Sequence, residues 1–132
     1  MTRRGTPPAY IVGSFDLFAL VERARAAAPG DVVLSTRLNM MVRDGRLIEL
    51  PPTKFRLVLA LAGPAALSVK ESIETMWGDD AAGGPENAPR TLYVHMCQLR
   101  PWLARLGLRI VRPLAGYYAI EADRITLTEA AE

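Results

Sequence analysis

Five arginines and no acidic residue lie between residues 90 and 112. They are Arg90, Arg100, Arg105, Arg109 and Arg112. The stretch before them, from Asp79 to Glu86, carries three acidic residues and no basic one. Guanidinium groups pair with phosphate oxygens, so a basic segment in a chain with a net charge of +2 is typical of contact with an anionic partner. A solvated helix face that lacks acids would give the same charge pattern.

The same segment holds side chains that can contact DNA. Gln98 can pair with adenine or touch a phosphate, and Arg90 and Arg100 can contact bases or phosphates. Four apolar residues recur at spacings of four, three and four, which predicts an amphipathic helix over residues 88–105 with its apolar row in the core. This row consists of Leu92, Met96, Leu99 and Leu103.

The sequence offers no constellation for catalysis or metal binding. Cys97 is the single cysteine and His95 the single histidine, so neither a disulfide framework within the chain nor a zinc site is expected. The glycines at residues 83–84 lie in a polar connection rather than between a strand and a helix, where a phosphate-binding loop would lie. We therefore predict that the protein is not an enzyme and has no catalytic residues, metal or cofactor.

No apolar run reaches the roughly 18 residues that a membrane span requires, so no span is expected. Residues 1–9 lack the apolar core of a signal peptide and are expected to be flexible. Together with the lone cysteine, these features favour a cytoplasmic protein.

The first part of the chain predicts a helix followed by short strands. Ser14 is a suitable cap for a helix over residues 14–28, which Pro29-Gly30 would end. The apolar stripe of this helix would either pack against the core or form a partner interface. Apolar runs over residues 31–50 predict two or three antiparallel strands. Asp44-Gly45 predicts a tight turn between two of them, because both turn residues need positive φ.

Three further helices and a hairpin complete the predicted order. Thr53 is a suitable cap for a buried helix, and Ser68 with Glu71 has the pattern of a capping box that opens the next one. A polar connection rich in glycine and proline leads to the helix at 88–105. The last apolar runs predict a hairpin with its turn at residues 113–116.

Four segments carry a resemblance to a known family. They are LPPTKFRL at residues 50–57, IETMWG at 73–78, RTLYVHMCQLRPWL at 90–103 and VRPLAGY at 111–117. Over residues 46–120 the chain resembles the effector domain of OmpR/PhoB-type response regulators, with these landmarks in the same order. The resemblance implies an α+β winged helix-turn-helix. It would have a small antiparallel N-terminal sheet, three core helices, a C-terminal β-hairpin wing and, in this chain, an extra N-terminal helix.

The resemblance also implies how the domain would contact DNA. A recognition helix at about residues 88–105 would enter the major groove, and a wing at about 109–120 would reach the adjacent backbone or minor groove. The DNA-contacting residues would be Arg90, Thr91, His95, Gln98, Arg100 and Arg112.

The chain departs from the family pattern within the recognition helix, so its contacts are expected to differ in detail. The departures are Tyr93, Cys97, Gln98 and Pro101. Pro101 lacks an N–H group and is expected to kink or distort the helix. We also expect no receiver domain, since 132 residues leave no room for one.

Two functions fit these observations. The first is a sequence-specific DNA-binding transcription regulator that binds double-stranded DNA through the recognition helix and the wing. The second is a winged-helix protein-interaction module, an adaptor or inhibitor of a regulator or of RNA polymerase, that no longer recognises DNA. Salt-dependent binding to random duplex DNA would separate them.

The predicted organisation assigns a role to each part of the chain. Residues 1–30 form an N-terminal extension, residues 31–122 the winged-helix domain and residues 123–132 a tail. The helix at 14–28 could join two copies into a homodimer. In the resembling family the loop equivalent to residues 78–89 can touch RNA polymerase, so the same contact is a hypothesis here.

Overall fold

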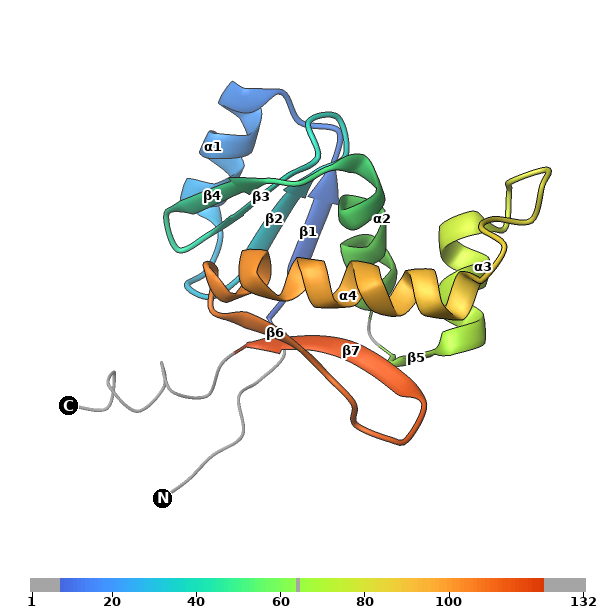
Figure 1. The fold of residues 1–132 in the computed structure, drawn as a ribbon. Helices are drawn as coiled ribbons and strands as arrows, with labels where there is room; N and C mark the ends of the chain where they lie inside the picture. Colours follow the sequence, from blue (N-terminus) through green and yellow to red (C-terminus); the bar gives the residue numbers. More distant parts are fainter. Residues whose placement is uncertain (1–7, 64, 123–132) are drawn as a thin grey trace, which may run out of the picture.

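A computed structural model describes residues 8–63 and 65–122, which form four helices and two β-sheets in an α+β arrangement (Figure 1). The first half contains β1 (Tyr10–Gly13), α1 (Leu17–Ala26), β2 (Val32–Ser35), β3 (Met40–Arg43), β4 (Arg46–Glu49) and α2 (Pro52–Leu61). The second half contains β5 (Leu67–Ser68), α3 (Val69–Trp77), α4 (Ala88–Ala104), β6 (Leu108–Val111) and β7 (Tyr117–Ala122).

The first sheet has the strand order β1-β2-β3-β4. Strands β2, β3 and β4 are antiparallel, as predicted, and Asp44 and Gly45 adopt φ of 48° and 81° in the tight turn between β3 and β4. The prediction of a purely antiparallel sheet is wrong, because β1 pairs with β2 in parallel. A parallel pair needs a crossover connection, and α1 provides it.

The helix α1 covers one face of this sheet. Leu20 is fully buried against Val33 and Val42, while Phe18 is 75% exposed on the opposite side of the helix. The helix is shorter than the predicted 14–28, and its N-cap is Asp16 rather than Ser14. The Asp16 carboxylate accepts a hydrogen bond from the backbone N–H of Ala19 at 2.8 Å. Residues 1–7 and the predicted tail, residues 123–132, lie outside the described residues.

The other face of the sheet meets the main core. Side chains alternate across a strand, so Val32 and Leu34 point away from α1 and pack with the apolar residues of α2, α3 and α4. The predicted apolar row of α4 is confirmed, since its four members are at most 2% exposed. The predicted capping box is also present, with Ser68 and Glu71 bonded to each other's backbone N–H groups at 3.0 and 2.8 Å.

One prediction about a helix end is wrong. Helix α2 begins at Pro52 with Pro51 as its N-cap and has no side-chain cap, so Thr53 does not cap it. Pro101 lies inside α4, which runs from Ala88 to Ala104 without a break, and the predicted kink stays a prediction. Its ring lies on the exposed side of the helix, where water can bind the carbonyl of Cys97 that a proline cannot satisfy.

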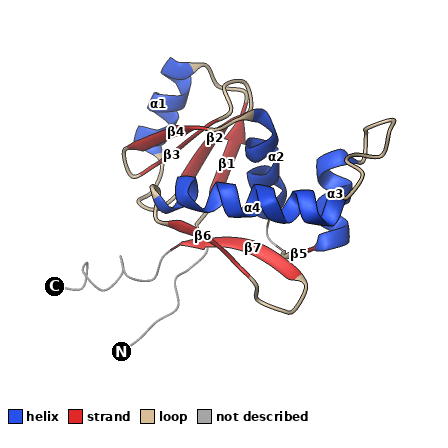
Figure 2. Ribbon diagram, viewed as in Figure 1, coloured by secondary structure: helices blue, strands red, loops and turns tan. Residues whose placement is uncertain are grey.

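The second sheet has the order β5-β7-β6 and contains the predicted terminal hairpin, whose turn lies between Val111 and Tyr117. Helix α4 runs beside this hairpin, as Figures 1 and 2 show. The hydroxyl of Tyr10 in β1 donates to the carbonyl of Ile120 in β7 at 3.4 Å, which joins the two sheets. Burial raises the pKa of Tyr10 to about 12, although Arg43 acts in the opposite direction. None of the described helices is long and apolar enough to cross a membrane.

Arg43, which is 8% exposed, ties β3 to the end of α4. Its Nη1 donates to the carbonyls of Leu106 and Gly107 at 2.6 and 3.3 Å, and its Nε donates to the carbonyl of Gly30 at 2.8 Å. Gly107 has φ of 69°, and a Cβ there would lie 2.9 Å from the Arg43 guanidinium. A cation beside the carbonyls at a helix C-terminus also interacts favourably with the helix dipole.

We therefore expect Arg43→Met to lower the free energy of unfolding by about 3 kcal/mol, because it leaves buried carbonyls without donors. Arg46→Met is the matched control, since exposed Arg46 also donates to a carbonyl near the end of α4, that of Arg105 at 3.1 Å. Its cost should be less than about 0.5 kcal/mol. Urea unfolding followed by tryptophan fluorescence measures both variants, and equal costs would contradict the role of Arg43.

Candidate nucleic-acid interface

The exposed side of α4 carries one continuous row of residues opposite the buried leucines. Residues at spacings of four, three, four and four share a helix face, and all five members of this row are exposed. Arginines stand at both ends, and apolar or weakly polar side chains stand between them. We call the set the outer row: Arg90, Val94, Cys97, Pro101 and Arg105.

The predicted contact residues on α4 do not all lie in the outer row. Arg90 does, and it forms no hydrogen bond or ion pair within the described residues. Arg100 faces the hairpin, where its Nη1 donates to the carbonyl of Ile110 at 3.0 Å. Gln98 is exposed on the other flank of the row, and Thr91 is half-buried in the first turn. The row is therefore flanked by one arginine and one amide.

His95 lies between α4 and the two preceding helices rather than in the outer row. Its ring centroid is 6.4 Å from that of Trp77, and its Nδ1 is 3.2 Å from the Nζ of Lys54. Burial lowers the pKa of His95 below its usual 6.5, and the positive charge of Lys54 lowers it further. A lowered pKa favours the neutral ring, whose unprotonated Nδ1 can accept a hydrogen bond from the Lys54 ammonium.

Arg112 follows β6 at the start of the hairpin turn, two residues beyond the Ile110 carbonyl that Arg100 contacts. Arg112 is exposed, and so are Leu114 and Tyr117 in and after the turn. Because β6 packs along α4, this turn projects from the same part of the molecule as the helix (Figure 1). Arg112 thus belongs to the hairpin whose strand β6 packs along α4.

Two basic residues near this surface, Lys54 and Arg105, were not among the predicted DNA contacts. Lys54 lies beside His95 in the structure although 41 residues separate them in sequence, and no local sequence pattern predicts that contact. Arg105 stacks on Trp102, with its Cζ 4.5 Å from the ring centroid. The spacing of the outer row would have found Arg105, because it follows Pro101 by four residues.

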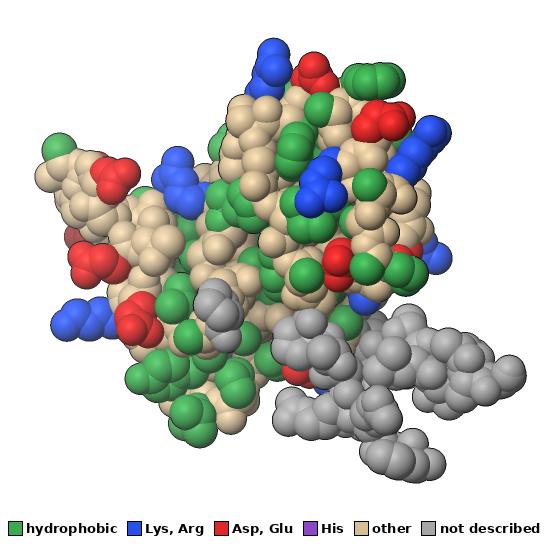
Figure 3. All heavy atoms as spheres, turned by 180° about the vertical axis from the view of Figure 1, so that it is seen from behind, with side chains coloured by type: hydrophobic (Ala, Val, Ile, Leu, Met, Phe, Trp, Pro, Cys, Tyr) green, Lys and Arg blue, Asp and Glu red, His purple; other side chains and the backbone are tan. Residues whose placement is uncertain are grey.

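Exposed acidic side chains lie on α3 and on the loop that follows it. Figure 3 shows the face behind α4, with acidic groups over α3 and this loop at the left of the view. This acidic region consists of Glu71, Glu74, Asp79, Asp80 and Glu86, which are all exposed. The outer row of α4 holds no carboxylate, and Glu86 of the acidic region precedes Arg90 by four residues.

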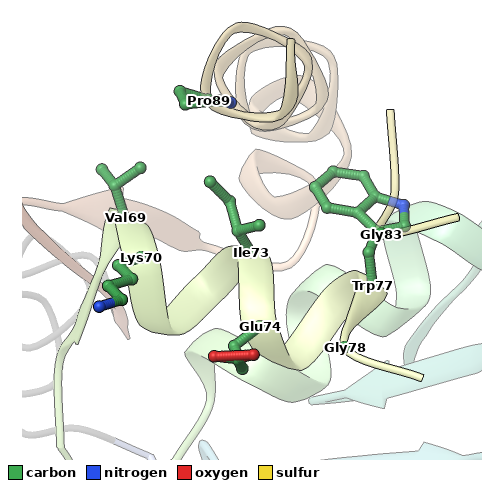
Figure 4. A pocket seen from close by; sticks show the side chains of 8 residues that line it. All are labelled: Val69, Lys70, Ile73, Glu74, Trp77, Gly78, Gly83 and Pro89. Carbon is green, nitrogen blue, oxygen red and sulfur yellow. The ribbon is translucent and has the colours of Figure 1, made fainter. Parts of the chain in front are cut away.

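A hollow of about 470 Å³ lies between α3 and the start of α4. In Figure 4, Val69, Ile73 and Trp77 point across it toward Pro89, while Lys70 and Glu74 point away. Its walls are mainly apolar, with Lys70 and Glu74 at its edge.

Within residues 8–63 and 65–122, no three His, Cys, Asp or Glu side chains are grouped so that they could hold a metal ion. Comparison with known protein families and with curated protein sequences gives no match for this chain.

The effect of Lys54 on His95 can be measured directly. Lys54→Met should raise the pKa of His95, because it removes a nearby positive charge, yet the pKa should stay below 6.5 because the burial remains. The single histidine gives one ring signal in an NMR pH titration of tag-free protein. Lys70→Met, on the exposed side of α3, should leave the pKa unchanged, and an unchanged value in Lys54→Met would contradict the contact.

Proposed function

We propose that the chain is a winged-helix transcription regulator that binds double-stranded DNA through the outer row of α4 and the β6–β7 hairpin. One observation carries the proposal. An exposed helix face free of carboxylates, with arginines at both ends, lies beside a hairpin that carries a further exposed arginine. An α-helix fits the major groove, and cationic side chains at its edges can hold phosphates of the two strands.

The order of elements supports the winged-helix assignment. Helices α2, α3 and α4 precede the hairpin, and the short strand β5 before α3 pairs with β7 of that hairpin. In a winged helix-turn-helix, α4 would be the recognition helix and the hairpin the wing. The proposal therefore places α4 in the major groove and Arg112 on the adjacent backbone or minor groove.

The chemistry of the outer row suggests how it would contact the groove. Val94 is 42% exposed and, with Cys97, offers an apolar surface suited to thymine methyl groups. Gln98 would contact a base edge or a phosphate, and Arg90, Thr91 and Arg100 would contact the backbone or nearby bases. Arg100 already donates to Ile110, so it would contact DNA with its remaining N–H groups.

The charge of the outer row supports this orientation, because the row holds no carboxylate that would repel DNA. DNA would repel the acidic loop at residues 78–89. We retain the hypothesis that it contacts RNA polymerase, and its exposed acids favour a basic partner surface.

A second candidate function is a protein-interaction module, and one observation favours it. The middle of the outer row is apolar, and neighbouring Tyr93 is 58% exposed. Exposed aromatic and apolar side chains between arginines are also common at protein interfaces. We place this function second because an apolar middle is compatible with the major groove and the arginines flank it on both sides.

A homodimer through α1 stays a prediction. One side of the helix is occupied by the sheet, and the side available to a partner carries Leu17 and Phe18, which are 52% and 75% exposed. We also retain the prediction that the protein is not an enzyme.

The salt dependence of DNA binding tests the proposed function. Each phosphate contact contributes about 0.9 to the slope of log K against log salt concentration, so Arg90→Ala with Arg112→Ala should lower that slope by about 1.8. These two arginines are chosen because neither has a partner within the described residues whose loss would disturb the fold.

Arg23→Ala with Arg25→Ala is the matched control, because it removes two exposed arginines of α1 on the other side of the sheet. The control should bind a random duplex as the wild type does in fluorescence anisotropy. Absence of wild-type binding at low salt would exclude the function, and equal slopes in both double variants would exclude this interface.

A further inference from the structure

Lys54 and His95 form a polar pair that the fold alone does not explain. Their Nζ and Nδ1 atoms are 3.2 Å apart, on the first turn of α2 and the middle of α4, and both residues are half-buried. Within the described part of the chain, neither forms an ion pair with an acidic residue, and the first turn of α2 holds none. A cation and a titratable ring that meet without a carboxylate are suited to an anion from outside.

The surroundings of His95 are otherwise short of charge. From α2 it faces Lys54, and from α3 it faces the indole of Trp77. Arg56 of α2 donates to the carbonyl of Met76 at 3.1 Å, and Glu74 of α3 points away from α4 (Figure 4). No acidic group of α2 or α3 is therefore placed to stabilise a protonated His95 in the free protein.

We infer that Lys54 and His95 together bind one backbone phosphate of the DNA and that His95 takes up a proton as that phosphate binds. The inference rests on the proposed function and adds a site at the flank of α4 nearest α2. In the free protein the Nδ1 lone pair accepts from the Lys54 ammonium. On binding, a proton from solvent moves to this nitrogen, and the imidazolium and the ammonium each donate to a phosphate oxygen. The N–H bond forms as an O–H bond of a hydronium ion breaks, and no other covalent bond changes.

The direction of the pH dependence follows from this step. The free pKa of His95 lies below 6.5, and a phosphate beside the ring raises it in the complex. At a pH between the pKa of His95 in the free protein and its pKa in the complex, the complex binds more protons than free protein and free DNA together. DNA affinity should therefore rise up to about tenfold for each pH unit of acidification in this range. At a pH above the pKa of the complex or below the pKa of the free protein, the contribution of His95 to DNA affinity should not change with pH.

The experiment uses tag-free protein and a random duplex of about two helical turns. The ring signal of the single histidine gives its pKa in the free protein, with duplex, and with inorganic phosphate at equal ionic strength. Anisotropy gives the affinity across the same pH range. We expect duplex to raise the pKa by at least about one unit, and His95→Gln to bind with little pH dependence.

The negative potential of DNA would raise the pKa of any histidine near the interface. A histidine at a second position of α4 therefore serves as a control for that general effect. The double variant His95→Gln with Gln98→His moves the ring one turn along α4, away from Lys54, and its pKa should rise less with duplex. An equal rise at both positions would overturn the inference.

Two further outcomes would also overturn it: DNA binding with an unchanged His95 pKa, or a rise with inorganic phosphate but not with duplex. Both leave the proposed function intact, whereas absence of DNA binding overturns that function itself. The amide spectrum of each variant confirms that it is folded.

Discussion

The buried guanidinium of Arg43 ties the C-terminal end of α4 to the sheet. It reaches from β3 to the carbonyls of Leu106 and Gly107, just past the end of α4, and to Gly30 in the turn before β2. Leucines alone would permit small rotations of a helix on its core, whereas hydrogen bonds to fixed carbonyls are directional. Because this anchor holds one end of α4, the core packing of its apolar row (Leu92, Met96, Leu99 and Leu103) also sets the direction of its outer row. Any interface on α4 depends on that constraint.

Helix α4 serves both the core and the proposed interface, and the two roles are divided by face. The apolar row is buried and the outer row is exposed. The flanks join α4 to its neighbours, through Arg100 on the hairpin side and His95 on the α2 side. The flank residues thus link the proposed DNA contacts to the fold. A phosphate held by Lys54 and His95 would bridge α2 and α4, and a contact by Arg100 would bridge α4 and the hairpin.

The sequence predicted the features that depend on neighbours along the chain. The row of leucines, the Asp44-Gly45 turn and the Ser68–Glu71 capping box are local patterns, and all three are present. It did not predict β1, because a four-residue apolar run shows neither its partner nor its direction. It also missed the contacts of Arg43 with Leu106 and of Lys54 with His95, whose partners lie 63 and 41 residues away. Of the candidate site, Arg90, Gln98 and Arg112 are exposed as an interface requires, while His95 lies on a flank.

The thiol of Cys97 tests the central claim most directly, because it lies at the centre of the outer row and is the single cysteine of the chain. With saturating random duplex at low salt, its reaction with a maleimide should slow at least about tenfold and recover as salt releases the DNA. Cys97→Ser with Glu22→Cys moves the thiol to the exposed side of α1, where its rate should not change. An unchanged rate at Cys97, with binding verified by anisotropy, would show that DNA does not cover the outer row of α4.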